Sequence, residues 1–177
     1  VINAQEGFFD VESVWPKLEQ ALRQAISNLV AMRETEGSNI YGDFIKRADL
    51  IAEKLAVIEE RSPQVVEEYQ IRLSDRINEL LAKHNQVIEP ERLLQEVAIF
   101  ADRTSITEEI VRLKSHIKQF KLIIDADQPV GRKLDFLIQE FNREANTIAS
   151  KANDYTLAQV VVEIKAEREK IREQIQN

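Results

Sequence analysis

The chain has 177 residues, a net charge of −7 at pH 7 and no cysteine, and 44% of its residues are hydrophobic. Its 4 glycines and 4 prolines are too few for a barrel or sandwich of short strands, so we predict an all-α protein. Without cysteine there are no disulfides, thiolate zinc sites or cysteine nucleophiles, and no apolar run is long enough to span a membrane, so a cytoplasmic protein is expected. Because the first residue is Val1 rather than Met, we expect a piece of a longer protein.

The first half of the chain predicts a long antiparallel helical hairpin. Apolar residues recur every three or four positions from Trp15 to Met32, and this helix is expected to end near Gly37. A second helix follows from Ile40, and Ser62-Pro63 is expected to end it and to begin a third. Residues 1–88 are therefore predicted to form a hairpin arm.

The second half of the chain predicts a compact helical domain over residues 89–177. Pro90 opens a short helix after a polar stretch that contains His84, and Ser105 with Glu108 reads as a capping box for the next helix. Further apolar stripes predict helices over 131–150 and from Thr156 onwards.

Positive charge gathers in this second half. Residues 1–103 carry the whole net charge of −7, whereas residues 110–151 have a small excess of Lys and Arg. The negatively charged backbone of RNA or DNA would be repelled least by this segment. The alternative is that these lysines and arginines only solvate a helix face, which explains the same excess of positive charge.

The predicted helix 131–150 carries an unusual polar face. The guanidinium group of arginine can bind a phosphate through two hydrogen bonds, and a side-chain amide offers both a hydrogen-bond donor and an acceptor. Most of its polar residues share one side of the helix: Arg132, Asp135, Gln139, Asn142, Arg143 and Asn146.

Glu140 and Glu144 lie on the flank of that face, one helical turn apart. Their carboxylates could together hold a hard divalent cation. The alternative is that they form surface ion pairs with Arg143, Lys133 or Lys151.

On the preceding helix, Glu109, Arg112 and His116 form another polar face. A neutral imidazole at His116 could bind a metal or carry a proton. It could equally be a partly buried histidine that is satisfied by Glu109 or by a carbonyl oxygen.

These segments resemble the YicC/YloC family of bacterial endoribonucleases. The most specific matches are residues 129–137 (PVGRKLDFL), 139–147 (QEFNREANT) and Ser150-Lys151. The specific part of the resemblance extends upstream to Glu96, and the further matches are residues 96–98, 101–103, 106–109, 111–116, 119–120, 162–165 and 172–177. Weaker matches at Trp15-Pro16 and at residues 32–34 and 36–37 extend it over essentially the whole chain.

The resemblance implies cytoplasmic, divalent-metal-dependent cleavage of RNA, with Mn²⁺ favoured and Mg²⁺ as the alternative. It also implies a homo-oligomer, a hexamer in the full-length family, and an N-terminal α/β domain that this chain lacks. RNA rather than DNA is the expected partner, and an inactive isolated piece is compatible with this resemblance.

From the resemblance and the helical spacing together, we assign candidate roles. Metal binding and catalysis fall to a subset of Glu109, His116, Asp135, Glu140 and Glu144, and RNA contacts to Arg112, Arg132, Gln139, Asn142, Arg143, Asn146 and Lys151. The competing hypothesis is a helical adaptor or oligomerisation module without catalytic activity. Non-catalytic RNA binding is less favoured because few aromatic residues look exposed.

Overall fold

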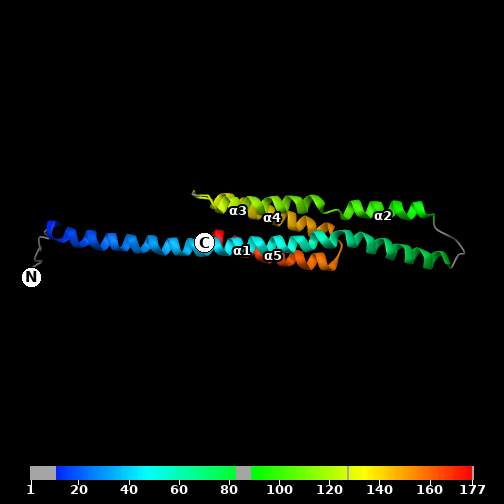
Figure 1. Cartoon of the computed structure of the whole chain (residues 1–177), viewed down its shortest axis with the longest axis horizontal. Coiled ribbons are helices and arrows are strands. Elements are labelled where there is room, and N and C mark those ends of the chain that lie inside the picture. The colour runs from blue at the N-terminus through cyan, green and yellow to red at the C-terminus, as the bar shows by residue number, and fades with distance from the viewer. Residues whose placement is uncertain (1–10, 83–88, 127, 177) are drawn as a thin grey trace, which may run out of the picture. The chain divides into compact units, whose positions relative to one another are not determined.

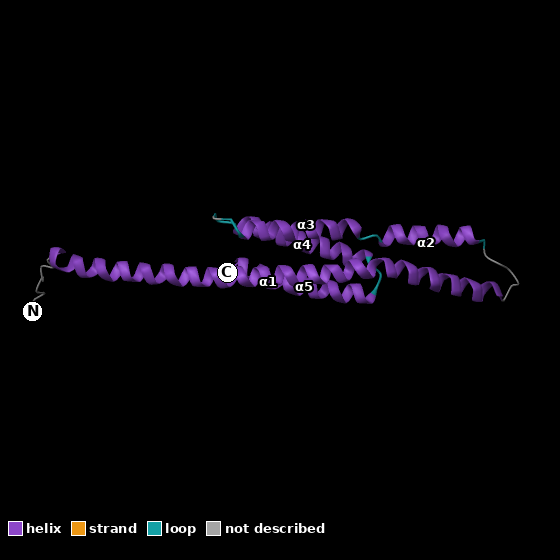
Figure 2. Cartoon of the chain, in the orientation of Figure 1, coloured by secondary structure: helices purple, strands orange, loops and turns teal. Residues whose placement is uncertain are grey.

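The computed structural model describes residues 11–82, 89–126 and 128–176. These residues form five helices and no strand (Figures 1 and 2). The helices are α1 (Val11–Ala82), α2 (Pro90–Thr104), α3 (Thr107–Ile124), α4 (Gly131–Lys151) and α5 (Tyr155–Gln176). The prediction of an all-α protein is therefore confirmed. No helix among the described residues has an apolar stretch long enough to cross a membrane.

Helix α1 shows that the predicted hairpin is wrong, because it runs unbroken through Gly37 and Pro63. In a helix interior, glycine costs about 1 kcal/mol and proline about 3 kcal/mol relative to alanine. Burial on both sides of Pro63 offsets this local cost, since Ile58 and Val65 are both withdrawn from solvent. Tertiary packing thus overrides the two local break signals.

The chain divides into two compact units, one ending at Gly42 and the other beginning at Asp43. This division differs from the predicted boundary after residue 88. The reason is that α1 contributes buried side chains to the same core as α3, α4 and α5. These α1 residues are Phe44, Ala48, Ile51, Leu55, Ile58 and Val65.

Within the second unit, α4 packs against both α3 and α5. Aromatic rings join the layers, with centroids 5.7 Å apart for Phe44 and Phe120 and 6.0 Å apart for Phe120 and Phe141. Ion pairs fix α1 to its neighbours: Arg47 contacts Glu167 on α5 at 2.8 Å, and Lys114 on α3 contacts Glu59 at 2.6 Å. This bundle holds α3 and α4 side by side.

The start of α3 differs from the predicted capping box. The residue before the helix is Ile106, which is buried, and no side chain caps the helix. The Ser105 backbone N–H donates to the Asp102 carbonyl, and Glu108 pairs with Arg112 one turn further on. Burial of Ile106 therefore sets the start of this helix. His84 lies outside the described residues.

Candidate metal centre between α3 and α4

Three predicted ligands from two helices converge in the second unit. His116 on α3 and Glu140 and Glu144 on α4 each offer a ligand atom, and these atoms lie within 4.8 Å of one another. Glu144 is 2% exposed, whereas His116 and Glu140 are partly exposed. The cluster therefore has a buried carboxylate at its base and two groups that solvent reaches.

The Nδ1 atom of His116 is buried and has no hydrogen-bond partner among the described residues. Buried polar atoms are normally paired, and one of the two ring nitrogens of His116 lies near the carboxylates of Glu140 and Glu144. The imidazole is therefore a candidate ligand-binding group.

Glu109 lies two turns before His116 on α3 and does not belong to this cluster. It is 4% exposed, and its Oε1 accepts a hydrogen bond from the Lys151 Nζ at 2.7 Å. Burial raises the pKa of Glu109, but the Lys151 ammonium and a backbone N–H lower it by more, so the carboxylate stays ionised. Its other oxygen, Oε2, is buried without a partner among the described residues.

Arg112 lies between these two layers. It pairs with Glu108 on its own helix, and its Nη1 atom is 3.9 Å from the Glu144 carboxylate. Burial and Lys151 have the larger effects on the pKa of Glu109, and the positive charge of Arg112 lowers this pKa further. Glu109 with Lys151 and Arg112 with Glu144 thus form successive polar contacts between α3 and α4, and His116 lies near Glu140 one turn beyond them.

Asp135 is not brought to the cluster. Its carboxylate accepts a hydrogen bond from Gln139 at 2.9 Å. At 3.6 residues per turn, Asp135 lies about 140° around α4 from Glu140, so the two carboxylates leave different sides of the helix. Gln139 and Asn146 are exposed and Asn142 is partly exposed, and all three share the side of Asp135.

Of the positively charged side chains that were predicted to bind RNA, some are exposed and others are paired with carboxylates. Arg132 is exposed on the first turn of α4. Arg143 approaches Glu140 at 3.5 Å but keeps 66% of its side chain exposed, so this predicted surface pair is weak. Lys151 is held by Glu109 and remains 38% exposed.

One residue beside the cluster, Phe136, was not predicted from the sequence as a site residue. Its side chain is 61% exposed on α4, four residues before Glu140. The signal was available, because Phe136 falls outside the apolar stripe that the rest of the helix buries.

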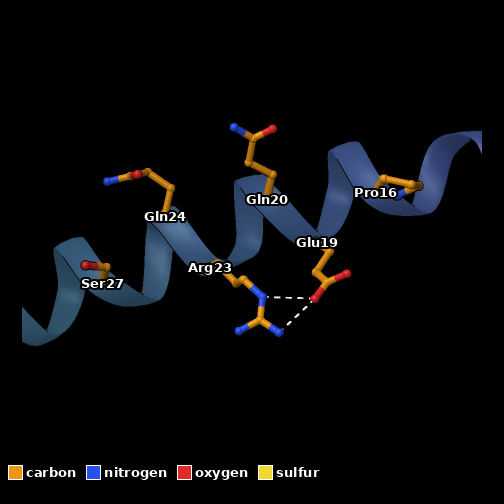
Figure 3. Close-up of a pocket in the computed structure, with 6 residues that line it drawn as sticks. All are labelled: Pro16, Glu19, Gln20, Arg23, Gln24 and Ser27. Atoms are coloured by element: carbon orange, nitrogen blue, oxygen red, sulfur yellow. Dashed lines mark hydrogen bonds and ion pairs between the residues drawn. The ribbon is translucent and has the colours of Figure 1, made fainter.

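A separate hollow lies along α1 in the first unit (Figure 3). There Arg23 pairs with Glu19 at 2.8 Å, while Gln20 and Gln24 point to another side of the helix. All of its lining residues come from a single helix: Pro16, Glu19, Gln20, Arg23, Gln24 and Ser27. It gathers no converging reactive groups, so the α3–α4 cluster is the stronger candidate site.

Comparison with known proteins identifies the family of the segment that contains these residues. The family model described as "Endoribonuclease YicC-like, C-terminal" matches residues 58–177, which include the whole cluster. Over its full length the chain is 49% identical to a protein of Clostridioides difficile (strain 630) and 36% identical to one of Haemophilus influenzae. Both relatives are named "Probable endoribonuclease YicC", and the chain spans 60% of the length of each.

The family match covers well over half of the chain and contains α2, α3, α4 and α5 entirely. The chain therefore belongs to the YicC-like endoribonuclease family, and its residues 58–177 match the C-terminal model of that family.

Proposed function

We propose that this chain carries the metal-binding part of an endoribonuclease that hydrolyses RNA phosphodiester bonds. The observation that carries the proposal is the convergence of His116, Glu140 and Glu144 from two helices within the family-matched segment. The names of the two relatives support RNA, rather than DNA, as the substrate. We further propose that the protein acts in the cytoplasm.

The donor set fits a divalent cation such as Mn²⁺ or Mg²⁺. Two carboxylates supply the oxygen ligands that these ions favour, and an imidazole suits first-row transition metals, which makes Mn²⁺ the better match. Around an octahedral Mg²⁺, neighbouring ligands lie about 3.0 Å apart and opposite ligands about 4.2 Å apart, so these ligand atoms, which lie within 4.8 Å of one another, would move closer together on binding. The unpaired Nδ1 of His116 is available for this role.

A bound divalent cation would neutralise charge on the attacked phosphate and lower the pKa of a water molecule. Glu144 provides a fixed, desolvated negative charge for that cation, while His116 and Glu140 keep the cluster open to solvent. Arg112 and Arg143 lie beside the cluster, where their guanidinium groups can hold neighbouring phosphates. Lys151 supplies a further positive charge two turns along α4 from Glu144.

The proposal is tested by incubating labelled RNA with the chain in Mn²⁺, in Mg²⁺ or in EDTA. A full-length relative such as the Clostridioides difficile protein is assayed in parallel. We expect cutting that depends on the divalent ion. Cutting by the longer protein alone would show that the chain holds only part of the site, whereas equal cutting in EDTA would contradict the metal role.

A second role, self-association, is favoured by a different observation. Apolar side chains remain exposed along α1 in the first unit, including Trp15, Leu18, Leu22, Leu29 and Met32. Their alternating spacing of three and four residues is the pattern of a helix that packs against another helix. We propose that this stripe packs in a homo-oligomer, as the family resemblance implies, and that it serves the nuclease rather than replacing it.

A further inference from the structure

Phe136 is an exposed aromatic residue on α4, a helix whose other large apolar side chains are buried. It is 61% exposed, whereas Leu134, Leu137 and Phe141 are at most 4% exposed. Its ring therefore adds little to the folding core and is available to a ligand.

The position of Phe136 on α4 is next to the candidate metal centre. Side chains four residues apart lie on the same side of a helix, so Phe136 lies one turn from the cluster residue Glu140. None of the three cluster residues buries it, since most of its surface is open to solvent.

Two arginines lie on the same side of α4 as Phe136. Arg132 is four residues before it and Arg143 is seven residues after it, and both are exposed. Arginine binds phosphate, and an exposed aromatic ring offers a flat apolar face on which a nucleobase can stack. An aromatic ring between two arginines is thus complementary to a single nucleic-acid strand.

We propose that Phe136 stacks on an unpaired base of the RNA strand whose backbone Arg132 and Arg143 hold beside the cluster. This inference rests on the proposed function and deepens it, because it names single-stranded RNA as the substrate class. Bases in a duplex are stacked within the helix and offer no free face, so a duplex does not satisfy this contact. The ring selects for unpaired segments, and the metal centre lies next to the base that it holds.

The test measures RNA binding without cleavage. Fluorescence anisotropy in EDTA compares a labelled single strand with a duplex of the same length for the wild-type chain and for Phe136→Ala. We expect Phe136→Ala to weaken single-strand binding by about 5- to 150-fold and to leave duplex binding nearly unchanged. Phe136→Trp and Phe136→Tyr should restore single-strand affinity, because each keeps an aromatic face.

The matched control is Val162→Ala, which truncates a similarly exposed apolar residue on α5. It should leave binding of both RNAs unchanged. Quenching of a 2-aminopurine base in the single strand adds a direct signal of stacking, and it should be lost in Phe136→Ala.

The outcomes separate this inference from the proposed function. If the chain cleaves RNA in a metal-dependent way and Phe136→Ala binds the single strand as tightly as the wild type, only the stacking role is overturned. Loss of single-strand affinity in a chain that never cleaves RNA supports stacking and counts against the nuclease. If the wild-type chain binds neither the single strand nor the duplex, the stacking role and the proposed nuclease function are both contradicted. If Phe136→Ala changes self-association but not RNA affinity, Phe136 belongs to a protein contact and the stacking role is overturned.

Discussion

Glu109 depends on Lys151 because its carboxylate is almost fully buried. An isolated buried charge is costly, and the lysine ammonium at 2.7 Å provides its compensating partner. The pair joins the first turn of α3 to the last turn of α4, next to the candidate metal centre. This single contact therefore contributes both to folding and to the alignment of the two helices that supply the cluster.

Replacing Lys151 with methionine should lower the free energy of unfolding by about 1–3 kcal/mol at pH 7, because it leaves the Glu109 carboxylate buried and unpaired. The folded-state pKa of Glu109 lies below its unfolded value of about 4.3, so the stabilisation is present above that pH and is lost as the pH falls through the folded pKa. Urea unfolding at pH 7 and at pH 3 measures the change.

The matched control is Lys114→Met, which removes the lysine of an exposed pair with Glu59. Lys114→Met should lower the free energy of unfolding by less than about 1 kcal/mol. The stability gap between wild type and Lys151→Met should narrow at low pH. An equal gap at both pH values would contradict the role assigned to Glu109.

At the scale of the element, the continuity of α1 is the main departure from expectation. Pro63 has no N–H to donate to the carbonyl of Glu59, yet the helix continues to Ala82. The helix is retained because its residues on either side of Pro63 pack into the bundle, with Ile58 and Val65 both buried. The energy that holds this segment comes from packing rather than from local propensity.

Substitution of Pro63 by alanine distinguishes a continuous helix from a broken one. In a continuous helix, alanine restores a backbone hydrogen bond and should raise the free energy of unfolding by about 1–3 kcal/mol. Gln64→Ala, at the next exposed position, should change it little. A clear loss of stability in Pro63→Ala would instead indicate that Ser62-Pro63 starts a separate helix, and urea unfolding decides between the two.

At the scale of the whole molecule, the apolar periodicity predicted the helical class and the limits of the last four helices closely. It failed at Gly37 and Pro63, because local signals there are worth about 1–3 kcal/mol and do not report how many side chains the helix buries elsewhere. Helix limits set by tertiary contacts are not visible in a local window.

The candidate site was predicted in part for a similar reason. Spacing within one helix pairs Glu140 with Glu144, and both join the cluster. The addition of His116 and the exclusion of Asp135 depend on how α3 faces α4, which spacing along a single helix does not contain. The family resemblance pointed to this segment but not to the convergence of its side chains.

The exposed stripe of α1 predicts that the chain associates with itself. Leu22→Glu with Leu29→Glu places two charges on the stripe and should convert an oligomer to smaller species in sedimentation velocity experiments. Gln20→Glu with Ser27→Glu adds the same charge at the same spacing outside the stripe, and should leave the oligomer intact. A wild-type chain that sediments as a monomer would contradict this prediction.

Titration with Mn²⁺, followed by electron paramagnetic resonance, measures whether His116, Glu140 and Glu144 together bind one divalent cation. Free Mn²⁺ gives a sharp signal that bound Mn²⁺ loses. Glu140→Gln with Glu144→Gln should weaken binding by about 100-fold or more, since even the partners behind metal ligands are worth 10- to 100-fold. Asp75→Asn with Glu79→Gln removes a similarly spaced, exposed acidic pair from α1 as the control. We expect one bound Mn²⁺ per chain in the wild type and in the control variant. At the same concentrations, the variant that carries Glu140→Gln and Glu144→Gln should bind none. Unchanged Mn²⁺ binding by a cluster variant that remains folded would contradict this expectation.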